Sequence, residues 1–165
     1  MGDVQQLVFE AVIIGAGATV VMDIWALFLK RFFNIPSLNY AMVGRWIGHF
    51  PQGTFMHENI VRAQPVHGEK LIGWGAHYGI GIVFAGVLLL LWGLEWAQQP
   101  TLFPALLIGI VTVVAPFVLM QPSFGFGIAA SKTPQPNRAR LLSLAAHSIY
   151  GFGLYLSALF WNQMF

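Results

Sequence analysis

Long apolar stretches alternate with shorter polar segments along the chain. Four of these stretches, residues 7–29, 71–94, 102–124 and 141–161, are each long enough to consider as membrane spans. A helix of about 20 apolar residues crosses the hydrocarbon core of a bilayer. In lipid, only helices and closed barrels satisfy their own backbone hydrogen bonds. The pattern therefore predicts an all-α, integral membrane four-helix bundle.

The first polar link, residues 30–70, is the longest and contains an amphipathic segment. Residues 39–50 predict a short interfacial helix. We expect its aromatic and aliphatic side chains to face lipid, and Arg45 and His49 to face water. The other two links are shorter, and the last one is rich in Gly and Pro.

Composition supports the membrane class. Hydrophobic residues make up 57% of the chain and charged residues 8%, whereas a soluble domain averages about 25% charged residues. The lipid bilayer is therefore the expected partner, and the length of 165 residues fits one domain. A net charge of +2 gives no indication of nucleic-acid binding, and the lack of cysteine excludes disulfides and thiolate metal sites.

The positive charges predict how the helices are oriented. All eight Lys and Arg residues lie in the first and third links. With four spans these links share one membrane face, and an excess of Lys and Arg marks the cytoplasmic face. We therefore expect a multi-pass protein of the inner (plasma) membrane with both termini in the periplasm or outside the cell. The first stretch lacks a basic start, which favours a retained span over a signal peptide.

Three polar residues are placed at one depth in the predicted spans. Asp23, His77 and His147 each lie about six residues, or roughly 9 Å, from the cytoplasmic end of a span. Ionisable residues within a span usually face the bundle interior and mark a functional site. We therefore predict a ligand- or ion-binding site at these three residues, open to the cytoplasm. Glu69 and Gln121 are candidates for a supporting role.

Three functions suit this set of residues. The first is a protein that binds or transports a small ligand or ion, in which the histidines bind the ligand or exchange protons. The second is a metal-dependent membrane enzyme, with Asp23, His77 and His147 as ligands of Zn²⁺ or Fe²⁺ and one position left open. The third is a structural or accessory subunit whose polar residues only join helices. Two histidines on diagonal spans could hold a haem, but no other feature of the sequence supports one. Because four spans make a small transporter, a homodimer is also expected.

The first link carries three further histidines, His49, His57 and His67, together with Glu58. Their spacing matches no dedicated metal site. We interpret them as solvated loop residues, with a metal-gathering surface as the alternative. Glu10 lies close to the outer end of the first span, where it can reach the interface, and receives no role.

Two of the stretches begin alike, with "AHYGIG" at residues 76–81 and "AHSIYGFG" at residues 146–153. Both open a span on the expected cytoplasmic side. The similarity favours two helical hairpins related by an axis along the membrane normal, as in parallel-repeat transporters.

Three segments carry a resemblance to a known family: "GRWIGHFPQGTFMHENI", "GEKLIGWGAHYGIGI" and "LMQPSFGFGIAASKTPQPNRARLLSLAAHSIYGFGLY". Together they resemble a bacterial family of small four-span membrane proteins, domain of unknown function 2938. The resemblance covers nearly the whole chain. It implies a four-helix protein of the bacterial inner membrane, and it brings no activity or catalytic residue with it.

Overall fold

The computed structural model describes residues 2–164, and within them every regular element is helical. Helix accounts for 77% of the chain. Four helices are long and apolar enough to cross a membrane, namely Asp3–Phe33, Glu69–Trp92, Leu102–Ser123 and Pro136–Met164. Large apolar side chains are exposed along all four of them, as expected for surfaces that face lipid. The all-α class with four potential spanning helices is therefore confirmed.

The helices extend beyond the apolar stretches into polar sequence. Helix α1 (Asp3–Phe33) continues through Lys30 and Arg31 and ends at Asn34, which adopts a left-handed conformation with φ of 53°. Asn tolerates this conformation well, and the adjacent Pro36 cannot continue a helix. Basic residues in the last turn also favour the negative end of the helix dipole. The polar ends lengthen the helix without lengthening its apolar part.

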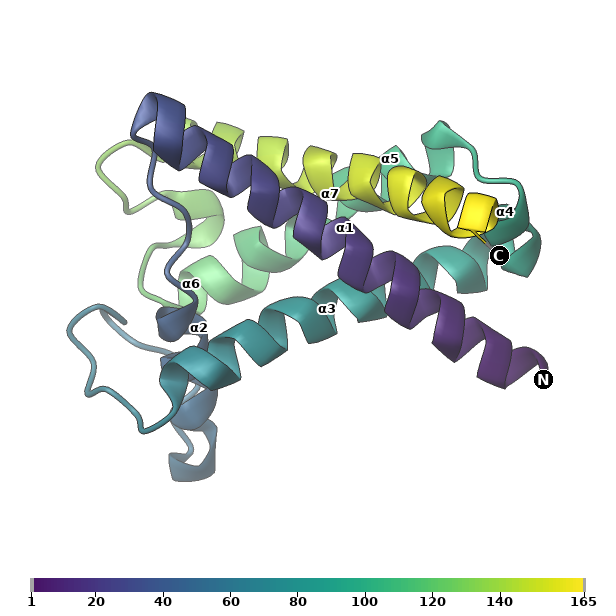
Figure 1. The fold of residues 1–165 in the computed structure, drawn as a ribbon. Coiled ribbons are helices and arrows are strands. Elements are labelled where there is room, and N and C mark those ends of the chain that lie inside the picture. Colours follow the sequence, from purple (N-terminus) through teal and green to yellow (C-terminus); the bar gives the residue numbers. More distant parts are fainter. Residues whose placement is uncertain (1, 165) are drawn as a thin grey trace. The chain divides into compact units, whose positions relative to one another are not determined.

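The chain forms two compact units. Unit 1 comprises the described parts of residues 1–37, 78–112 and 145–165. It contains α1, the later part of α3 (Glu69–Trp92), α4 (Leu94–Gln98), α5 (Leu102–Thr112) and the later part of α7 (Pro136–Met164). These helices are labelled in Figure 1.

Helices of unit 1 approach one another at small residues. A methyl group added at Gly109 of α5 would lie 2.6 Å from the Cα of Gly151 in α7. One added at Gly153 would lie 2.9 Å from the Cα of Ala18 in α1. Small residues at such crossings allow close backbone packing in lipid, where the hydrophobic effect does not drive helices together.

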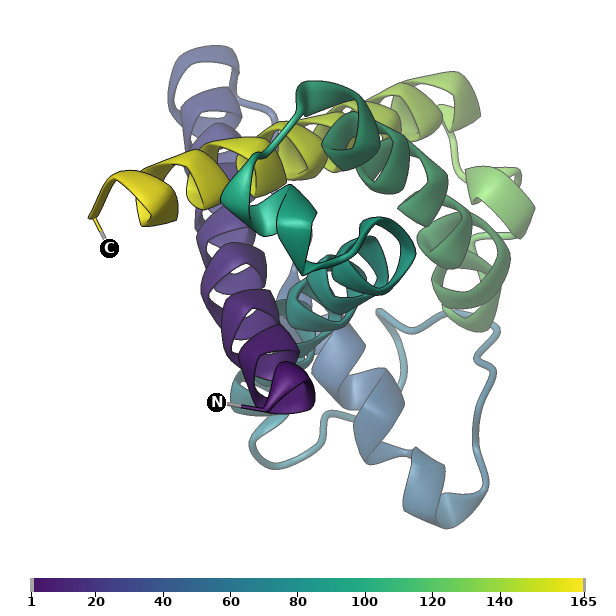
Figure 2. The ribbon, with the colours of Figure 1, turned by 90° about the vertical axis from the view of Figure 1, so that its right-hand side faces the viewer.

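Both termini of the described chain lie at one end of unit 1, together with α4, which Figure 2 views end on. Trp96 and Ala97 of α4 are buried there. The side-chain amide of Asn162 donates hydrogen bonds to the carbonyls of Ala97 (2.6 Å) and Gln98 (2.9 Å). These bonds attach the end of α7 to the link between α3 and α5.

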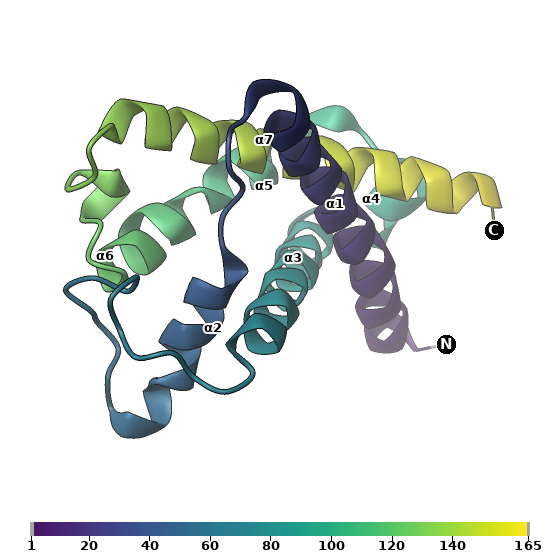
Figure 3. The same ribbon diagram turned by 60° about the vertical axis from the view of Figure 1, so that its left-hand side comes forward.

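Unit 2 comprises residues 38–77 and 113–144. Its first half contains α2 (Tyr40–Gly48), the 3₁₀ turn η1 (Phe50–Gln52), an irregular loop and the first residues of α3. Figure 3 shows α2 beside the start of α3. Its second half contains the π-helical turn η2 (Pro116–Met120), α6 (Gln121–Ser123), the 3₁₀ turn η3 (Ile128–Ala130) and the start of α7. Pro116 has no amide proton, which agrees with the loss of regular α-helix at this point.

The irregular loop is anchored to the segment around α6. The amide of His57 donates to the carbonyl of Ser123 (2.8 Å), and the amide of Ile60 donates to that of Phe124 (3.1 Å). Ile60 and Phe124 are fully buried and form a small core with Val43 of α2. The loop thus belongs to the packed interior of unit 2.

The predicted orientation of the short helix is wrong for its polar residues. Helix α2 forms within the expected segment, but the Arg45 side chain is only 13% exposed and His49 only 8%. Both are covered by the loop, whose carbonyls and ring nitrogens satisfy their hydrogen bonds. An amphipathic pattern alone does not show whether polar side chains meet water or a loop.

Candidate functional site

Asp23 is half-buried on α1, and its carboxylate is held by a tyrosine of α3. The Tyr78 hydroxyl donates a hydrogen bond to Asp23 Oδ2 at 3.0 Å. Both residues belong to unit 1 and lie in potential spans. A hydrogen bond to a charged group is stronger than one between neutral groups. Tyr78 therefore fixes the position of the carboxylate and offsets part of the cost of placing it in a span.

His147 of α7 is oriented by a threonine of α5. The Thr112 hydroxyl donates to the carbonyl of Gly109 (2.7 Å), and its oxygen lies 3.0 Å from His147 Nδ1. Since the only hydroxyl proton is used by Gly109, Thr112 must accept from Nδ1–H. We infer from this network that the neutral ring carries its proton on Nδ1. Its Nε2 then keeps a lone pair for a proton, a metal or another ligand.

Asp23 and His147 lie on the same side of the point where α1 and α7 cross. The two helices approach at Ala18 and Gly153. Asp23 is five residues after Ala18, and His147 is six residues before Gly153, which corresponds to roughly 8 and 9 Å along the two axes. Because the spans alternate in direction, both displacements lead toward the same end of unit 1.

His77 belongs to unit 2, whereas Asp23 and His147 belong to unit 1. Within unit 2 the His77 ring stacks on Tyr40 with 4.1 Å between ring centroids. It also contacts the edge of Trp74 at 5.7 Å. These aromatic contacts position the ring, and the participation of His77 in a site with the other two residues stays a prediction.

The structure gives no support to a three-residue metal centre. Among residues 2–164, no group of three or more His, Cys, Asp or Glu side chains is placed to hold a metal ion. A zinc or iron site needs at least three protein ligands in close reach of one point. The assignment of Asp23, His77 and His147 as metal ligands therefore stays a prediction without a geometric observation behind it.

Glu69 forms an ion pair with Arg45. The guanidinium donates two hydrogen bonds to the carboxylate, from Nε (2.9 Å) and Nη2 (3.0 Å). Its Nη1 donates to loop carbonyls, those of Ile60 and Ala63 at 3.1 Å and that of Val61 at 3.3 Å. The bond to Glu69 raises the pKa of the Arg45 guanidinium above its ordinary value.

This ion pair connects α2, the loop and the start of α3 at one point. The sequence did not reveal it, because Arg45 and Glu69 are separated by the whole loop. A supporting role of Glu69 at the predicted ligand site stays a prediction.

Gln121 is buried in unit 2, with 7% of its surface exposed. Its amide nitrogen donates a long hydrogen bond of 3.4 Å to the Ser143 hydroxyl. Its Oε1 has no hydrogen-bond partner among the described residues. The side chain therefore has an unused acceptor, and a supporting role at the predicted site is untested.

Two of the loop histidines are paired and are not simply solvated. His49 Nδ1 lies 2.8 Å from His57 Nε2. Burial, followed by the nearby His49, lowers the pKa of His57 below its ordinary value. His67 is exposed, as expected. The pair can share one proton between its rings, whereas two positive rings at this distance would repel each other.

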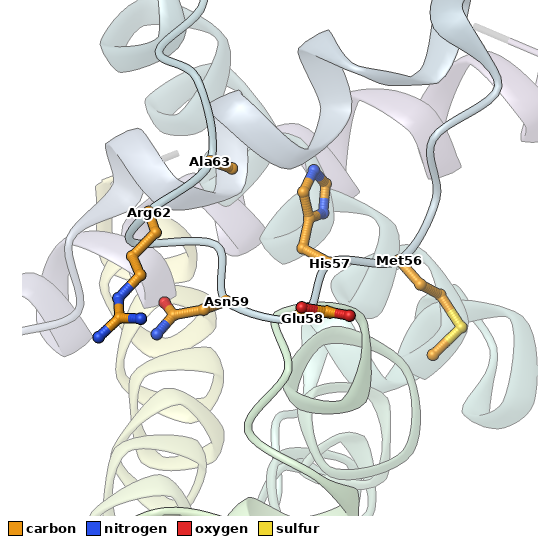
Figure 4. Close-up of a pocket in the computed structure, with 6 residues that line it drawn as sticks. All are labelled: Met56, His57, Glu58, Asn59, Arg62 and Ala63. Carbon is orange, nitrogen blue, oxygen red and sulfur yellow. The ribbon is translucent and has the colours of Figure 1, made fainter.

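An open cavity of about 380 Å³ is lined in part by His57 (Figure 4). Glu58 and Arg62 contribute opposite charges to its lining but form no ion pair with each other, as far as the structure describes the chain. The remaining lining residues are Met56, His57, Asn59 and Ala63. Both charged side chains are exposed to solvent, so the cavity is a shallow polar surface of the loop.

Sequence reasoning missed the hydroxyl groups that position the candidate site. Tyr78 follows His77 directly, and its aromatic ring reads as an ordinary part of a span. Thr112 lies three residues after Gly109. A threonine in a helix often bonds to a carbonyl one turn earlier, so its hydroxyl gives no sign of a contact with another helix. A hydroxyl at one span opposite an ionisable residue of another is the signal that would have found them.

Comparison with known proteins gives a family but no function. No curated protein and no solved structure matches the chain. The model of a family described as protein of unknown function, DUF2938, matches residues 12–161. That range extends over both units and includes all or most of each long helix. The chain therefore belongs to the DUF2938 family.

Proposed function

We propose that this protein is a multi-pass protein of the bacterial inner membrane that binds or transports a small ligand or ion, with Asp23 supplying a negative charge and His147 exchanging protons. His77 is proposed as the third member of the site. The proposal places both termini outside the cytoplasm, in agreement with the location of all Lys and Arg residues in the first and third links. It also includes a homodimer as the form in the membrane.

One observation carries the proposal. Two ionisable side chains within potential spans, Asp23 and His147, are each held in place by a hydroxyl group of a neighbouring helix in unit 1. An ionisable residue in a span is costly, by about 2.5–3.5 kcal/mol for Asp at the helix centre. Helix association alone could use Ser, Thr or Asn at lower cost. A positioned acid and base favour a function that uses their charge.

The two groups are suited to different steps. Asp23 supplies a negative charge that attracts a cation or the positive part of a ligand. His147 presents Nε2, which can exchange a proton or coordinate a ligand. Together they would allow the protein to take up a ligand and a proton from the same end of unit 1.

The experiment uses the full chain in liposomes that contain a pH-sensitive dye, with proton movement as the probe. A potassium gradient and valinomycin impose an inside-negative potential. We expect protein-dependent acidification of the lumen, which is lost in Asp23→Asn and in His147→Gln. Asp3→Asn is the matched control, because Asp3 is an exposed carboxylate of the same helix, and it should behave as wild type.

Two outcomes would overturn the proposal. If both site variants retain wild-type proton movement and change only stability, the polar residues serve helix association. If the purified protein holds stoichiometric metal that is lost in both variants, and moves no protons, the residues serve a metal centre instead.

A further inference from the structure

Glu10 is a buried acid near the start of α1 for which the proposed site has no use. Its side chain is 7% exposed. Oε1 accepts a hydrogen bond of 2.9 Å from the Gln6 amide. Oε2 is buried and has no hydrogen-bond partner among residues 2–164. One oxygen of this carboxyl group is therefore satisfied and the other is not.

The residues adjacent to Glu10 in α1 are apolar. Ala11 and Ile14, on the same helix, are part of the unit 1 core. Phe9 packs edge-on against Trp161 of α7, with 5.5 Å between ring centroids. The same end of unit 1 is covered by α4 and its bonds to Asn162. Glu10 is thus buried within unit 1. The sequence-based expectation that it reaches the interface is not met.

No basic side chain is available in unit 1 to balance a negative charge at Glu10. The only Lys and Arg residues in the sequence ranges of unit 1 are Lys30 and Arg31. Lys30 is twenty residues away on the same helix, or about 30 Å along its axis. A buried carboxylate without a positive partner is strongly unfavourable. A neutral carboxyl group avoids this cost.

We propose that Glu10 is a proton-binding site in the first span, separate from the Asp23 and His147 site. A proton needs only the one oxygen that is left over, whereas a hard metal cation needs several oxygen ligands around it. In the neutral acid, Oε1 acts as the carbonyl oxygen that accepts from Gln6, and Oε2 carries the hydrogen. Glu10 is thirteen residues from Asp23, about 20 Å along α1, so the two acids act at different depths.

The test is labelling of the full chain in liposomes with the hydrophobic reagent dicyclohexylcarbodiimide. The protonated carboxyl group adds across one C=N bond of the reagent. Its oxygen bonds to the central carbon, its proton moves to nitrogen, and no group leaves. Peptide mapping by mass spectrometry then locates the adduct. We expect an adduct on the peptide that contains Glu10.

Exposed acids at the same end of unit 1 provide matched controls. Asp3 of α1 and Glu95 of α4 are exposed, so a water-soluble carbodiimide should label them and leave Glu10 unlabelled. Glu10→Gln should abolish the hydrophobic adduct, while Asp3→Asn should keep it. Labelling of the wild type is informative by itself, even if Glu10→Gln does not fold.

Three results would overturn the inference. The first is the absence of a hydrophobic adduct on Glu10 at every pH. The second is labelling of Glu10 by the water-soluble reagent to the same extent as Asp3. The third is protection of Glu10 by sodium chloride but not by choline chloride at fixed pH, since this would assign a metal cation to the site. None of these results bears on proton movement through Asp23 and His147.

Discussion

The two units of this protein are stabilised in different ways. In unit 1, long helices cross at small residues such as Gly109 and Gly151, and Asp23 and His147 are each hydrogen-bonded to a hydroxyl group. In unit 2, a short helix and an irregular loop are connected by an ion pair between Arg45 and Glu69 and by a histidine pair. Close packing dominates the first unit, and polar interactions dominate the second.

The difference teaches how the surroundings of a segment select its interactions. Helices in lipid gain no hydrophobic free energy by associating, so close van der Waals packing has to hold them. A loop between spans has many backbone carbonyls that need donors, and an arginine offers five. We therefore expect unit 1 to be sensitive to side-chain volume, and unit 2 to charge and pH.

The largest effect is expected from Arg45→Met in unit 2. Removing one partner of a sheltered ion pair leaves an uncompensated charge and costs about 3–5 kcal/mol. Here the variant also leaves loop carbonyls without their donor. Hydrogen exchange of the amides in residues 57–66 measures this cost as a lower free energy of loop opening.

Two further variants sharpen this prediction. Arg62→Met removes an exposed arginine of the same loop and should change the free energy of opening by less than about 0.5 kcal/mol. Adding Glu69→Leu to Arg45→Met should recover part of the loss, because the unpaired charge is removed as well. Equal costs for Arg45→Met and Arg62→Met would show that the ion pair does not hold the loop.

A smaller effect is expected from Gly109→Ala in unit 1. The added methyl would lie 2.5 Å from the carbonyl oxygen of His147 and 2.6 Å from the Cα of Gly151. Overpacking of this kind costs about 1–3 kcal/mol. Unfolding in mixed micelles, with an increasing fraction of a denaturing detergent, measures the free energy of unfolding of the variant and of the wild type.

Gly79→Ala is the matched control for volume. An added methyl at Gly79 has no heavy atom within 4 Å, and alanine favours helix over glycine by about 1 kcal/mol. We expect this variant to be as stable as wild type or more so. If Gly79→Ala were destabilised as much as Gly109→Ala, close packing at helix crossings would not explain the effect of the added methyl group.

Thr112→Val tests the polar contact in unit 1 and should cost about 1 kcal/mol, the typical value of one hydrogen bond. The substitution keeps the shape of the side chain and removes the acceptor of His147 Nδ1–H. We expect ¹⁵N spectra of the labelled histidine to show a change in the population of its two tautomers. Thr133→Val removes a hydroxyl in unit 2 that bonds to Ala130, and it should leave the His147 spectrum unchanged.

The sequence predicted the parts of this structure that depend on one segment at a time. Apolar length was enough for the four long helices, because a span must satisfy its own backbone. It also predicted that a short helix would form near Arg45. In these cases the sequence of one segment is sufficient to determine that it forms a helix.

Features that join distant segments were not predicted. The direction of Arg45 depends on carbonyls of a loop fifteen or more residues away. The burial of Glu10 in unit 1 depends on packing against α1 by segments that are distant in the sequence. Neither is encoded in hydrophobic periodicity, because a helix has the same pattern whether a polar residue faces water or a covering segment.

The smallest effect is expected from pH at the histidine pair of unit 2. Burial, and then the nearby His49, lowers the pKa of His57 in the closed loop below the ordinary value of 6.5. Between the lowered pKa and 6.5, the open loop binds more protons than the closed one. The free energy of opening therefore rises with pH through this window and falls when the pH drops below about 6.5.

Hydrogen exchange of the His57 and Ile60 amides, corrected for the intrinsic pH dependence of exchange, measures this effect. Both amides bond to carbonyls of the segment around α6, so they report the closed loop. His57→Gln should remove the pH dependence, and the exposed His67→Gln should keep it. Amides at the crossing of Ala18 and Gly153 in unit 1 provide the comparison, because no histidine lies at that crossing. An equal pH dependence of these amides and of the unit 2 amides would mean that the histidine pair is not its source, and the contrast between a volume-sensitive unit and a charge-sensitive unit would fail at this point.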